Sequence, residues 1–165
     1  MSKYVVEEYF RFYRETYDLD FMSLGFANVY GPRQDPHGEA GVVAIWVGDL
    51  LAGRTPTMYG DGSQTRDFVF VEDVTDALFR ASRTGGSRYL NIGTGVETSV
   101  MKLYESIVDA TGTDTAPIMA APRRGEQLRS CLDASAARQY LGWEAWTPLD
   151  EGIERTVEWW KTTEE

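Results

Sequence analysis

Three arginines in two turns are the first residues whose types and spacing predict chemistry. Arg66 follows the glycine-rich turn GDGSQT and precedes the apolar stretch DFVFV, a position that holds a guanidinium rigidly. Arg123 and Arg124 lie in a second loop, PRRGE, with Glu126 close behind. Guanidinium groups bind phosphates and carboxylates through paired N–H donors, so two anchored arginine sites indicate a local pocket for an anion. Ordinary solvated surface charge explains the same residues equally well.

The overall charge makes a local anion pocket informative. The chain has 165 residues, 42% of them apolar, and a formal net charge of −10. Such a protein has no general attraction for nucleic acid or anionic membranes, so placed cationic side chains must hold any anionic ligand. One cysteine, Cys131, excludes an internal disulfide, and the longest apolar runs, such as VVAIWV, are too short to span a bilayer. No signal peptide is visible. We expect a cytoplasmic protein without nucleic-acid or membrane partners.

The other candidate motifs favour ordinary structure. NIGTG, residues 91–95, lacks the third glycine of a dinucleotide fingerprint, and a tight turn between strand and helix explains it better. His37 lies in a proline- and glycine-containing loop, where an inert surface histidine is expected. The sequence contains no Walker A loop, metal-ligand cluster or G-x-S-x-G elbow.

Strands that alternate with helices must position these residues. Over residues 3–17 the apolar side chains fall within an arc of roughly 160°, which predicts an amphipathic helix with a broad aromatic face. Residues 21–29 are typical of one buried strand, and short strands are expected at TMY, DFVFV, YLNI and PIMA. The predicted helix caps are Asp73, Thr98 or Ser99, Asp133 and Thr147, and the predicted helix stops are Gly53, Gly112 and Gly142. The fold class is therefore α/β.

Five segments together resemble one family. FANVYGPRQ, YGDGSQTRDFVFVEDV, NIGTG, PRRGE and LGWE…PLDEGIERTVEWW, in this order and spacing, resemble the extended short-chain dehydrogenase/reductase family. Within it they are most similar to the NAD-dependent nucleotide-sugar epimerases and dehydratases of the UDP-glucose 4-epimerase type. The resemblance covers essentially the whole chain and implies the C-terminal part of an extended Rossmann-type fold. Residues 1–31 and 66–95 would belong to the parallel sheet and its helices, and residues 32–65 and 96–165 to a small substrate-binding subdomain.

The resemblance also concerns the first residues. Members of the family carry a Tyr-x-x-x-Lys pair on a helix, and Ser2 and Lys3 match the end of that motif. Its tyrosine would stand two residues before the first position, and Tyr4 cannot replace it because adjacent helical residues point about 100° apart. The family's glycine-rich NAD-binding turn would also lie upstream. We therefore expect the C-terminal half of an epimerase, which lacks the NAD-binding part and is inactive alone.

The catalytic chemistry follows from the same resemblance. In the family the tyrosine takes a proton from a sugar hydroxyl while NAD accepts a hydride, and the transient keto sugar then receives the hydride on its other face. The lysine that Lys3 matches lowers the pKa of the tyrosine and binds the nicotinamide ribose. Phe26 stands beside the nicotinamide pocket where the family commonly has tyrosine, and Gly25 replaces an arginine. Lys3 and Phe26 are thus the expected cofactor-binding residues.

Seven residues are expected around a UDP- or dTDP-sugar: Asn28, Val42, Val43, Tyr59, Arg66, Arg123 and Glu126. The resemblance implies that Asn28 and both arginines contact the phosphates, with Arg124 as the alternative to Arg123. The acidic Glu126 would hold the nucleotide ribose, and two valines would place their backbone near the nucleotide. Tyr59 would pack against uracil, or else be an aromatic residue of the core.

Several functional alternatives follow. The chain is the substrate-binding half of an epimerase, a non-catalytic nucleotide-sugar-binding module, or an enzyme completed by a second chain that carries the Rossmann half. A dehydratase or reductase half is the alternative to an epimerase half. In each case we expect an open edge beside the strand at 21–29 and a partly bare aromatic face on helix 3–17. Such a chain would form a homodimer or depend on another polypeptide.

Overall fold

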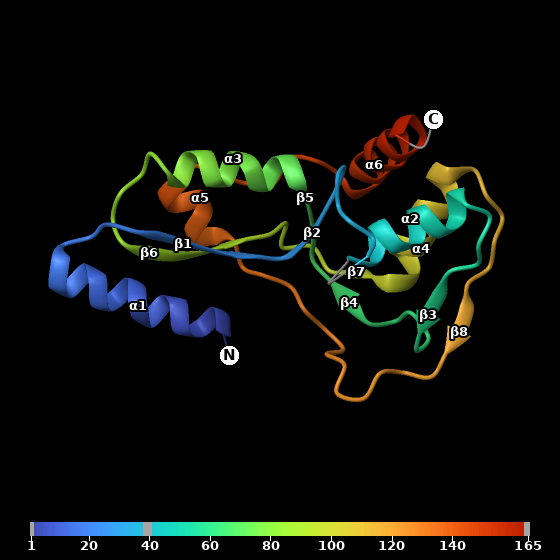
Figure 1. The fold of residues 1–165 in the computed structure, drawn as a ribbon, viewed down its shortest axis with the longest axis horizontal. Helices are drawn as coiled ribbons and strands as arrows, with labels where there is room; N and C mark the ends of the chain where they lie inside the picture. The colour runs from blue at the N-terminus through green and yellow to red at the C-terminus, as the bar shows by residue number, and fades with distance from the viewer. Residues whose placement is uncertain (1, 38–40, 164–165) are drawn as a thin grey trace.

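Helices and strands alternate along the chain, as the sequence pattern predicts (Figure 1). The computed structural model describes residues 2–37 and 41–163, with side chains from Val5 onward. The helices are α1 (Ser2–Tyr17), α2 (Val42–Leu51), α3 (Val71–Ala81), α4 (Val100–Thr111), α5 (Ser135–Leu141) and α6 (Leu149–Thr163). The strands are β1 (Met22–Phe26), β2 (Asn28–Tyr30), β3 (Thr57–Tyr59), β4 (Thr65–Arg66), β5 (Phe68–Phe70), β6 (Arg88–Ile92), β7 (Thr98–Ser99) and β8 (Ile118–Ala120). None of the described helices has the length and hydropathy that crossing a bilayer requires.

The described strands form four pairs. Strands β1 and β6 are parallel, with Met22 opposite Arg88 and Phe26 opposite Ile92. The pairs β2–β5 and β3–β8 are also parallel, whereas β4 and β7 are antiparallel. Parallel strands connected through helices confirm the α/β class and give the chain a Rossmann-like arrangement.

The prediction of one strand over residues 21–29 was wrong, because the chain changes partner at Ala27. The Ala27 N–H donates to the Ile92 carbonyl at 2.9 Å, which ends the ladder with β6. The next amide, that of Asn28, donates to the Asp67 carbonyl at 2.8 Å and starts the ladder with β5. The mostly apolar stretch over residues 21–29 therefore divides between two strand pairs.

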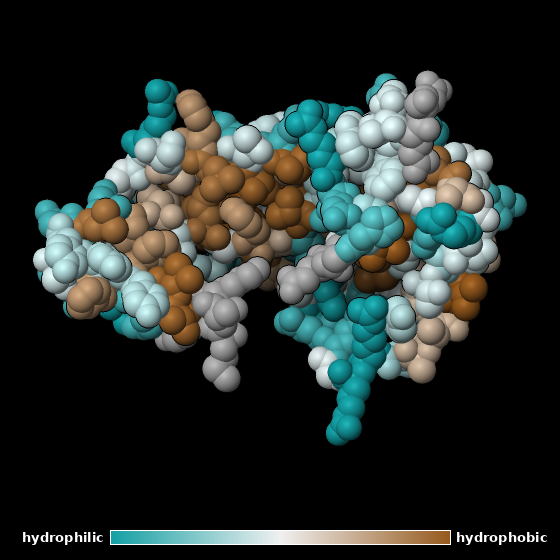
Figure 2. Space-filling view, in the orientation of Figure 1, coloured by the Kyte–Doolittle hydropathy of each residue, from teal (hydrophilic) through white to brown (hydrophobic). Residues whose placement is uncertain are grey.

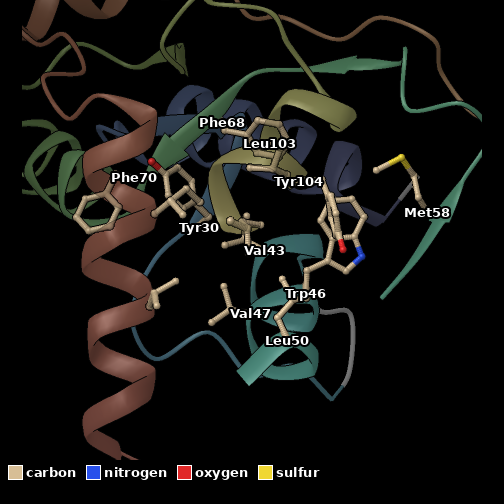
Figure 3. Close-up of a cluster of buried hydrophobic side chains, with 13 residues drawn as sticks. Tyr30, Val43, Trp46, Val47, Leu50, Met58, Phe68, Phe70, Leu103 and Tyr104 are labelled. Carbon is tan, nitrogen blue, oxygen red and sulfur yellow. The ribbon is translucent and has the colours of Figure 1, made fainter. Parts of the chain in front are cut away.

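Two hydrophobic clusters hold these elements together. The larger one packs α2, α4 and α6 against β2, β3 and β5 (Figure 3). In it the rings of Trp46 and Tyr104 meet edge to face, with 5.1 Å between their centroids. The smaller cluster packs α3, α5 and Trp143 against β1 and β6. The predicted division into residues 1–31 with 66–95 and residues 32–65 with 96–165 stays a prediction. It assigns α5 and Trp143 to the second part, although both pack against β1 and β6 of the first.

Helix α1 leaves most of its aromatic face uncovered. Tyr9, Phe12 and Tyr17 are 60%, 53% and 66% exposed. Among its described side chains, half-buried Phe10 stacks on Phe21 with 5.1 Å between ring centroids. Figure 2 also shows apolar surface gathered where β1, β6 and α3 lie in Figure 1. These exposures confirm the expected bare aromatic face.

The ends of the helices show which predicted caps and stops are present in the structure. Ser99 caps α4, because its hydroxyl accepts a hydrogen bond from the Lys102 N–H at 3.1 Å, and Gly112 ends that helix in a left-handed conformation. The prediction of Asp73 as a cap was wrong, because it lies inside the first turn of α3 and its carboxylate binds Thr147 instead of a helix amide. Asp133 stands one residue before the cap position of α5, Ala134, but its carboxylate does accept a hydrogen bond from the N–H of Ser135, the first residue of that helix, at 2.9 Å.

Candidate functional site

A cavity of about 680 Å³ opens between α2, strands β3 and β4, and the loop that follows β8. Its lining residues are Asn28, Gly41, Val42, Ile45, Trp46, Asp49, Thr57, Tyr59, Gln64, Arg66, Phe68, Val100, Arg123 and Glu126. Both arginines therefore border the same cavity, although 56 residues of the chain lie between Arg66 and Arg123. The prediction that this cavity binds an anion stays a prediction.

Six of the seven expected substrate contacts line this cavity: Asn28, Val42, Tyr59, Arg66, Arg123 and Glu126. Val43 does not line it, because its side chain is 1% exposed within the larger cluster. Arg124 is exposed and absent from the lining, so Arg123 is the arginine that this loop presents to the cavity.

The expected cofactor residues lie elsewhere. The backbone of Lys3 belongs to α1, and its side chain lies outside the part of the chain that the structure describes. Phe26 ends β1 and is 44% exposed, away from the cavity lining. Beside it, the Tyr89 ring occupies the space over Gly25, so a Cβ at position 25 would clash with the Tyr89 hydroxyl. An arginine at position 25 would therefore require Tyr89 to move.

Arg66 is the most firmly held cation of the cavity. Its Nη1 donates to its neighbour's carbonyl, that of Thr65, at 2.8 Å, and its Nη2 donates to Glu126 at 3.4 Å. The two charged side chains are 18% and 24% exposed. A guanidinium has five N–H donors, more than these two bonds use, so it can bind an anion without releasing its supports.

Arg123 and Tyr59 form a second contact within the cavity. The Arg123 guanidinium lies over the Tyr59 ring, 4.0 Å from its centroid, a cation–π geometry. Tyr59 is 38% exposed, so it is not a core aromatic. Gln64 supports this strand because its Nε2 donates to the Tyr59 carbonyl at 2.8 Å. The cavity thus offers a flat aromatic face beside two cations.

Helix α2 begins at this cavity. Gly41 and Val42 line the cavity, and Gly41 is the cap residue, with no side-chain hydrogen bond to the first amides. The first N–H groups of a helix have no intrahelical acceptor and attract anions. The amides at the start of α2 therefore add positive potential to the cavity that the arginines line.

Asp67 fixes the neighbouring glycine-rich turn and decides what that turn can bind. Its carboxylate is 1% exposed and accepts hydrogen bonds from the Thr94 N–H at 2.9 Å, the Thr94 hydroxyl at 2.6 Å and the Gly95 N–H at 3.1 Å. The Leu132 N–H adds a fourth bond at 3.3 Å. These amides face a protein carboxylate, so this turn does not fit a dinucleotide pyrophosphate. The interpretation of NIGTG as a structural turn is confirmed.

Sequence reasoning missed several lining residues, notably Trp46, Asp49 and Gln64. The Trp46 Nε1 donates to the Thr57 carbonyl at 3.2 Å, so it holds β3 while one part of its ring borders the cavity. Asp49 pairs with Arg54 at 2.8 Å. Helical spacing on α2 places Trp46 and Asp49 one turn after Val42 and Ile45, and that spacing was the available signal.

A family model and a curated relative that match this chain both name an epimerase. The family model described as NAD dependent epimerase/dehydratase family matches residues 1–93. A curated UDP-glucose 4-epimerase of Mycolicibacterium smegmatis is 52% identical over 161 residues, which are 97% of this chain and 51% of the relative. The chain thus spans about half the length of the curated relatives it matches.

Solved structures show the same likeness. The UDP-glucose 4-epimerase of Thermotoga maritima with UDP-glucose superimposes with a TM-score of 0.95 at 44% identity, over 99% of this chain and 53% of that one. The Thermus thermophilus UDP-glucose 4-epimerase in complex with NAD gives a TM-score of 0.84 at 38% identity, over 94% and 51%. Because the family model matches more than half of the residues of this chain, the chain belongs to the NAD-dependent epimerase/dehydratase family.

Proposed function

We propose that the cavity binds a UDP-sugar and that the chain is the nucleotide-sugar-binding part of an NAD-dependent sugar-nucleotide epimerase. The observation that carries this proposal is the convergence of Arg66, Arg123, Asn28 and Tyr59 with the start of α2 around one cavity. Such a ligand needs cationic and amide donors for its diphosphate and a flat face for its base. The T. maritima relative, whose structure holds UDP-glucose, supports UDP-glucose as the first ligand to test.

Each group then has a specific task. Arg66 and Arg123, together with the amides at the start of α2 and the Asn28 side chain, bind the diphosphate. Glu126 accepts hydrogen bonds from the ribose hydroxyls while it pairs with Arg66. The Tyr59 ring packs on the uracil ring, so the Arg123 guanidinium that now covers it moves toward the diphosphate.

We do not expect NAD to bind to these residues. The family uses this cofactor for hydride transfer, but the glycine-rich turn at residues 93–95 already binds Asp67. We therefore expect these 165 residues by themselves to bind UDP-glucose and not NAD.

Calorimetric titration tests the proposal. UDP-glucose, dTDP-glucose and NAD are titrated separately into the purified chain, and NMR of the sugar follows any conversion. Arg66→Ala should weaken UDP-glucose binding by about 30-fold, which corresponds to roughly 2 kcal/mol for a lost charged hydrogen-bonding group. Arg138→Ala is the matched control, because Arg138 pairs with Glu144 outside the cavity and is 72% exposed.

The outcomes separate the alternatives. Binding of UDP-glucose that Arg66→Ala weakens and Arg138→Ala leaves unchanged supports the proposal. Tighter binding of dTDP-glucose would favour the dehydratase half. If the chain binds no nucleotide sugar at millimolar concentration, or if both variants bind equally well, the assignment of this cavity is wrong.

A further inference from the structure

The loop that carries Arg123 and Glu126 has little regular structure of its own. Residues 121–134, all of them described, contain a single bridge, between Arg129 and Thr65, and no helix or strand. Most of their side chains are exposed, so apolar burial contributes little to holding this segment. Its position must therefore come from a small number of polar contacts.

Thr65 of β4 provides the backbone part of this docking. Its N–H donates to the Leu128 carbonyl at 2.9 Å, and its carbonyl accepts a hydrogen bond from the Ser130 N–H at 3.1 Å. These two bonds fix the register of the loop beside β4. Glu126, two residues before Leu128, is thereby brought to Arg66, the residue after Thr65.

Glu97, which lies outside the cavity lining, ties the side chains of the same two segments together. Its Oε2 accepts hydrogen bonds from the Arg129 Nε at 3.0 Å and from the Thr65 hydroxyl at 2.7 Å. Its Oε1 accepts a further bond from Arg129 Nη2, so the pairing with the guanidinium is bidentate. The hydrogen bonds from Arg129 and Thr65 lower the pKa of Glu97 to about 2, so the carboxylate is ionised at neutral pH.

We propose that Glu97 is a positioning residue for nucleotide-sugar binding, because through Arg129 and Thr65 it holds the loop that presents Arg123 and Glu126 to the cavity. This inference rests on the proposed function of that cavity. Exposed ion pairs contribute little to global stability, so removal of Glu97 releases the loop without unfolding the chain. The effect is expected in local opening and in ligand affinity.

Two measurements test the inference, one of which needs no ligand. Amide hydrogen exchange, followed by NMR, reports the Thr65 and Ser130 N–H groups that join the loop to β4. Calorimetry gives the dissociation constant for UDP-glucose. In Glu97→Ala we expect both amides to exchange about tenfold faster and UDP-glucose to bind about tenfold more weakly, the equivalent of one charged hydrogen bond. The thermal midpoint should stay within a few degrees.

Three further variants make the test specific. Glu144→Ala removes an exposed glutamate that also pairs with an arginine, at 2.6 Å from Arg138, and should change neither quantity. Arg129→Ala should reproduce the effects of Glu97→Ala. The double variant should be no worse than Glu97→Ala, because that single variant already removes the pairing with Arg129.

The outcomes decide the inference separately from the proposed function. Faster exchange at Thr65 and Ser130 together with weaker binding supports it. Unchanged exchange, or faster exchange with unchanged affinity, overturns it. If the unsubstituted chain binds no UDP-glucose, the proposed function fails, and exchange alone then decides whether Glu97 holds the loop.

Discussion

Asp67→Asn tests how much one buried carboxylate, which binds the turn at residues 94–95 and Leu132, contributes to the stability of the chain. Both carboxylate oxygens face N–H donors: Oδ1 accepts hydrogen bonds from the Thr94 amide and hydroxyl, and Oδ2 from the Gly95 and Leu132 amides. An asparagine must turn its NH₂ group toward one of these sets. The less costly choice replaces Oδ1, because the Thr94 hydroxyl can reverse and accept, yet the Thr94 amide then loses its acceptor.

The magnitude follows from these contacts. A buried, unsatisfied backbone donor costs about 1–3 kcal/mol, and the two remaining hydrogen bonds each weaken by roughly 1 kcal/mol when the acceptor loses its charge. We therefore expect the free energy of unfolding to fall by about 3–5 kcal/mol in Asp67→Asn. For a chain of this size, each kcal/mol lowers the thermal midpoint by about 2–4 °C. Urea denaturation monitored by tryptophan fluorescence measures the loss.

Asp73→Asn is the matched control. This carboxylate is also buried, but it binds the Thr147 amide at 3.1 Å and the Thr147 hydroxyl at 2.7 Å. Because that hydroxyl can reverse and accept from the new NH₂ group, both hydrogen bonds survive. The expected loss is about 2 kcal/mol or less, because the bond from the Thr147 amide weakens by roughly 1 kcal/mol when its acceptor loses its charge and the first turn of α3 loses a negative charge. Equal losses in the two variants, or a loss below about 1 kcal/mol in Asp67→Asn, would refute this reasoning.

Three more predictions concern other parts of the chain. Gly62→Ala should destabilise by about 2–3 kcal/mol in urea denaturation, because φ is +77° and the new Cβ would stand 2.7 Å from a methionine sulfur, whereas Gly53→Ala, with φ +69° and open space, should cost about 1 kcal/mol. The lowered pKa of Glu97 predicts a stabilisation that is complete above the ordinary glutamate pKa of 4.5 and lost as pH falls toward 2, so the urea midpoint of Glu97→Gln should fall less than that of the unsubstituted chain between pH 5 and pH 2.5. The exposed aromatic side chains of α1 should bind a hydrophobic dye, and the double variant Phe12→Lys/Tyr17→Lys should bind less dye while its far-ultraviolet spectrum stays unchanged. Equal dye fluorescence would show that α1 is not the surface that binds the dye.

Local signals were enough to predict most elements. The α1 and α4 helices follow from apolar periodicity, and the Ser99 cap and Gly112 stop need no information from elsewhere in the chain. The errors came from distant partners. The break at Ala27 depends on Ile92 and Asp67, and the use of Asp73 depends on Thr147.

The site could be predicted in part for the same reason. Arg66 and Arg123 stand beside turns whose glycines and prolines are visible in the sequence, so their place in loops could be predicted, whereas Glu126 and Tyr59, which contact them, are distant in the sequence. Helical spacing after Val42 could have indicated Trp46, whereas Gln64 borders the cavity through its bond to the Tyr59 carbonyl, which no local pattern reveals. The ligand roles of the lining residues stay predictions.

The strand pairing has a consequence for how the chain folds. Every described pair joins segments that are distant in the sequence: Met22 meets Arg88, Asn28 meets Phe68, Thr57 meets Ile118 and Thr65 meets Ser99. A long loop must close before any ladder forms, so the entropy loss precedes the compensating contacts. Refolding is therefore expected to be slow, on the scale of milliseconds to seconds, and apolar strands remain exposed during that time. Yield on refolding should accordingly fall as protein concentration rises.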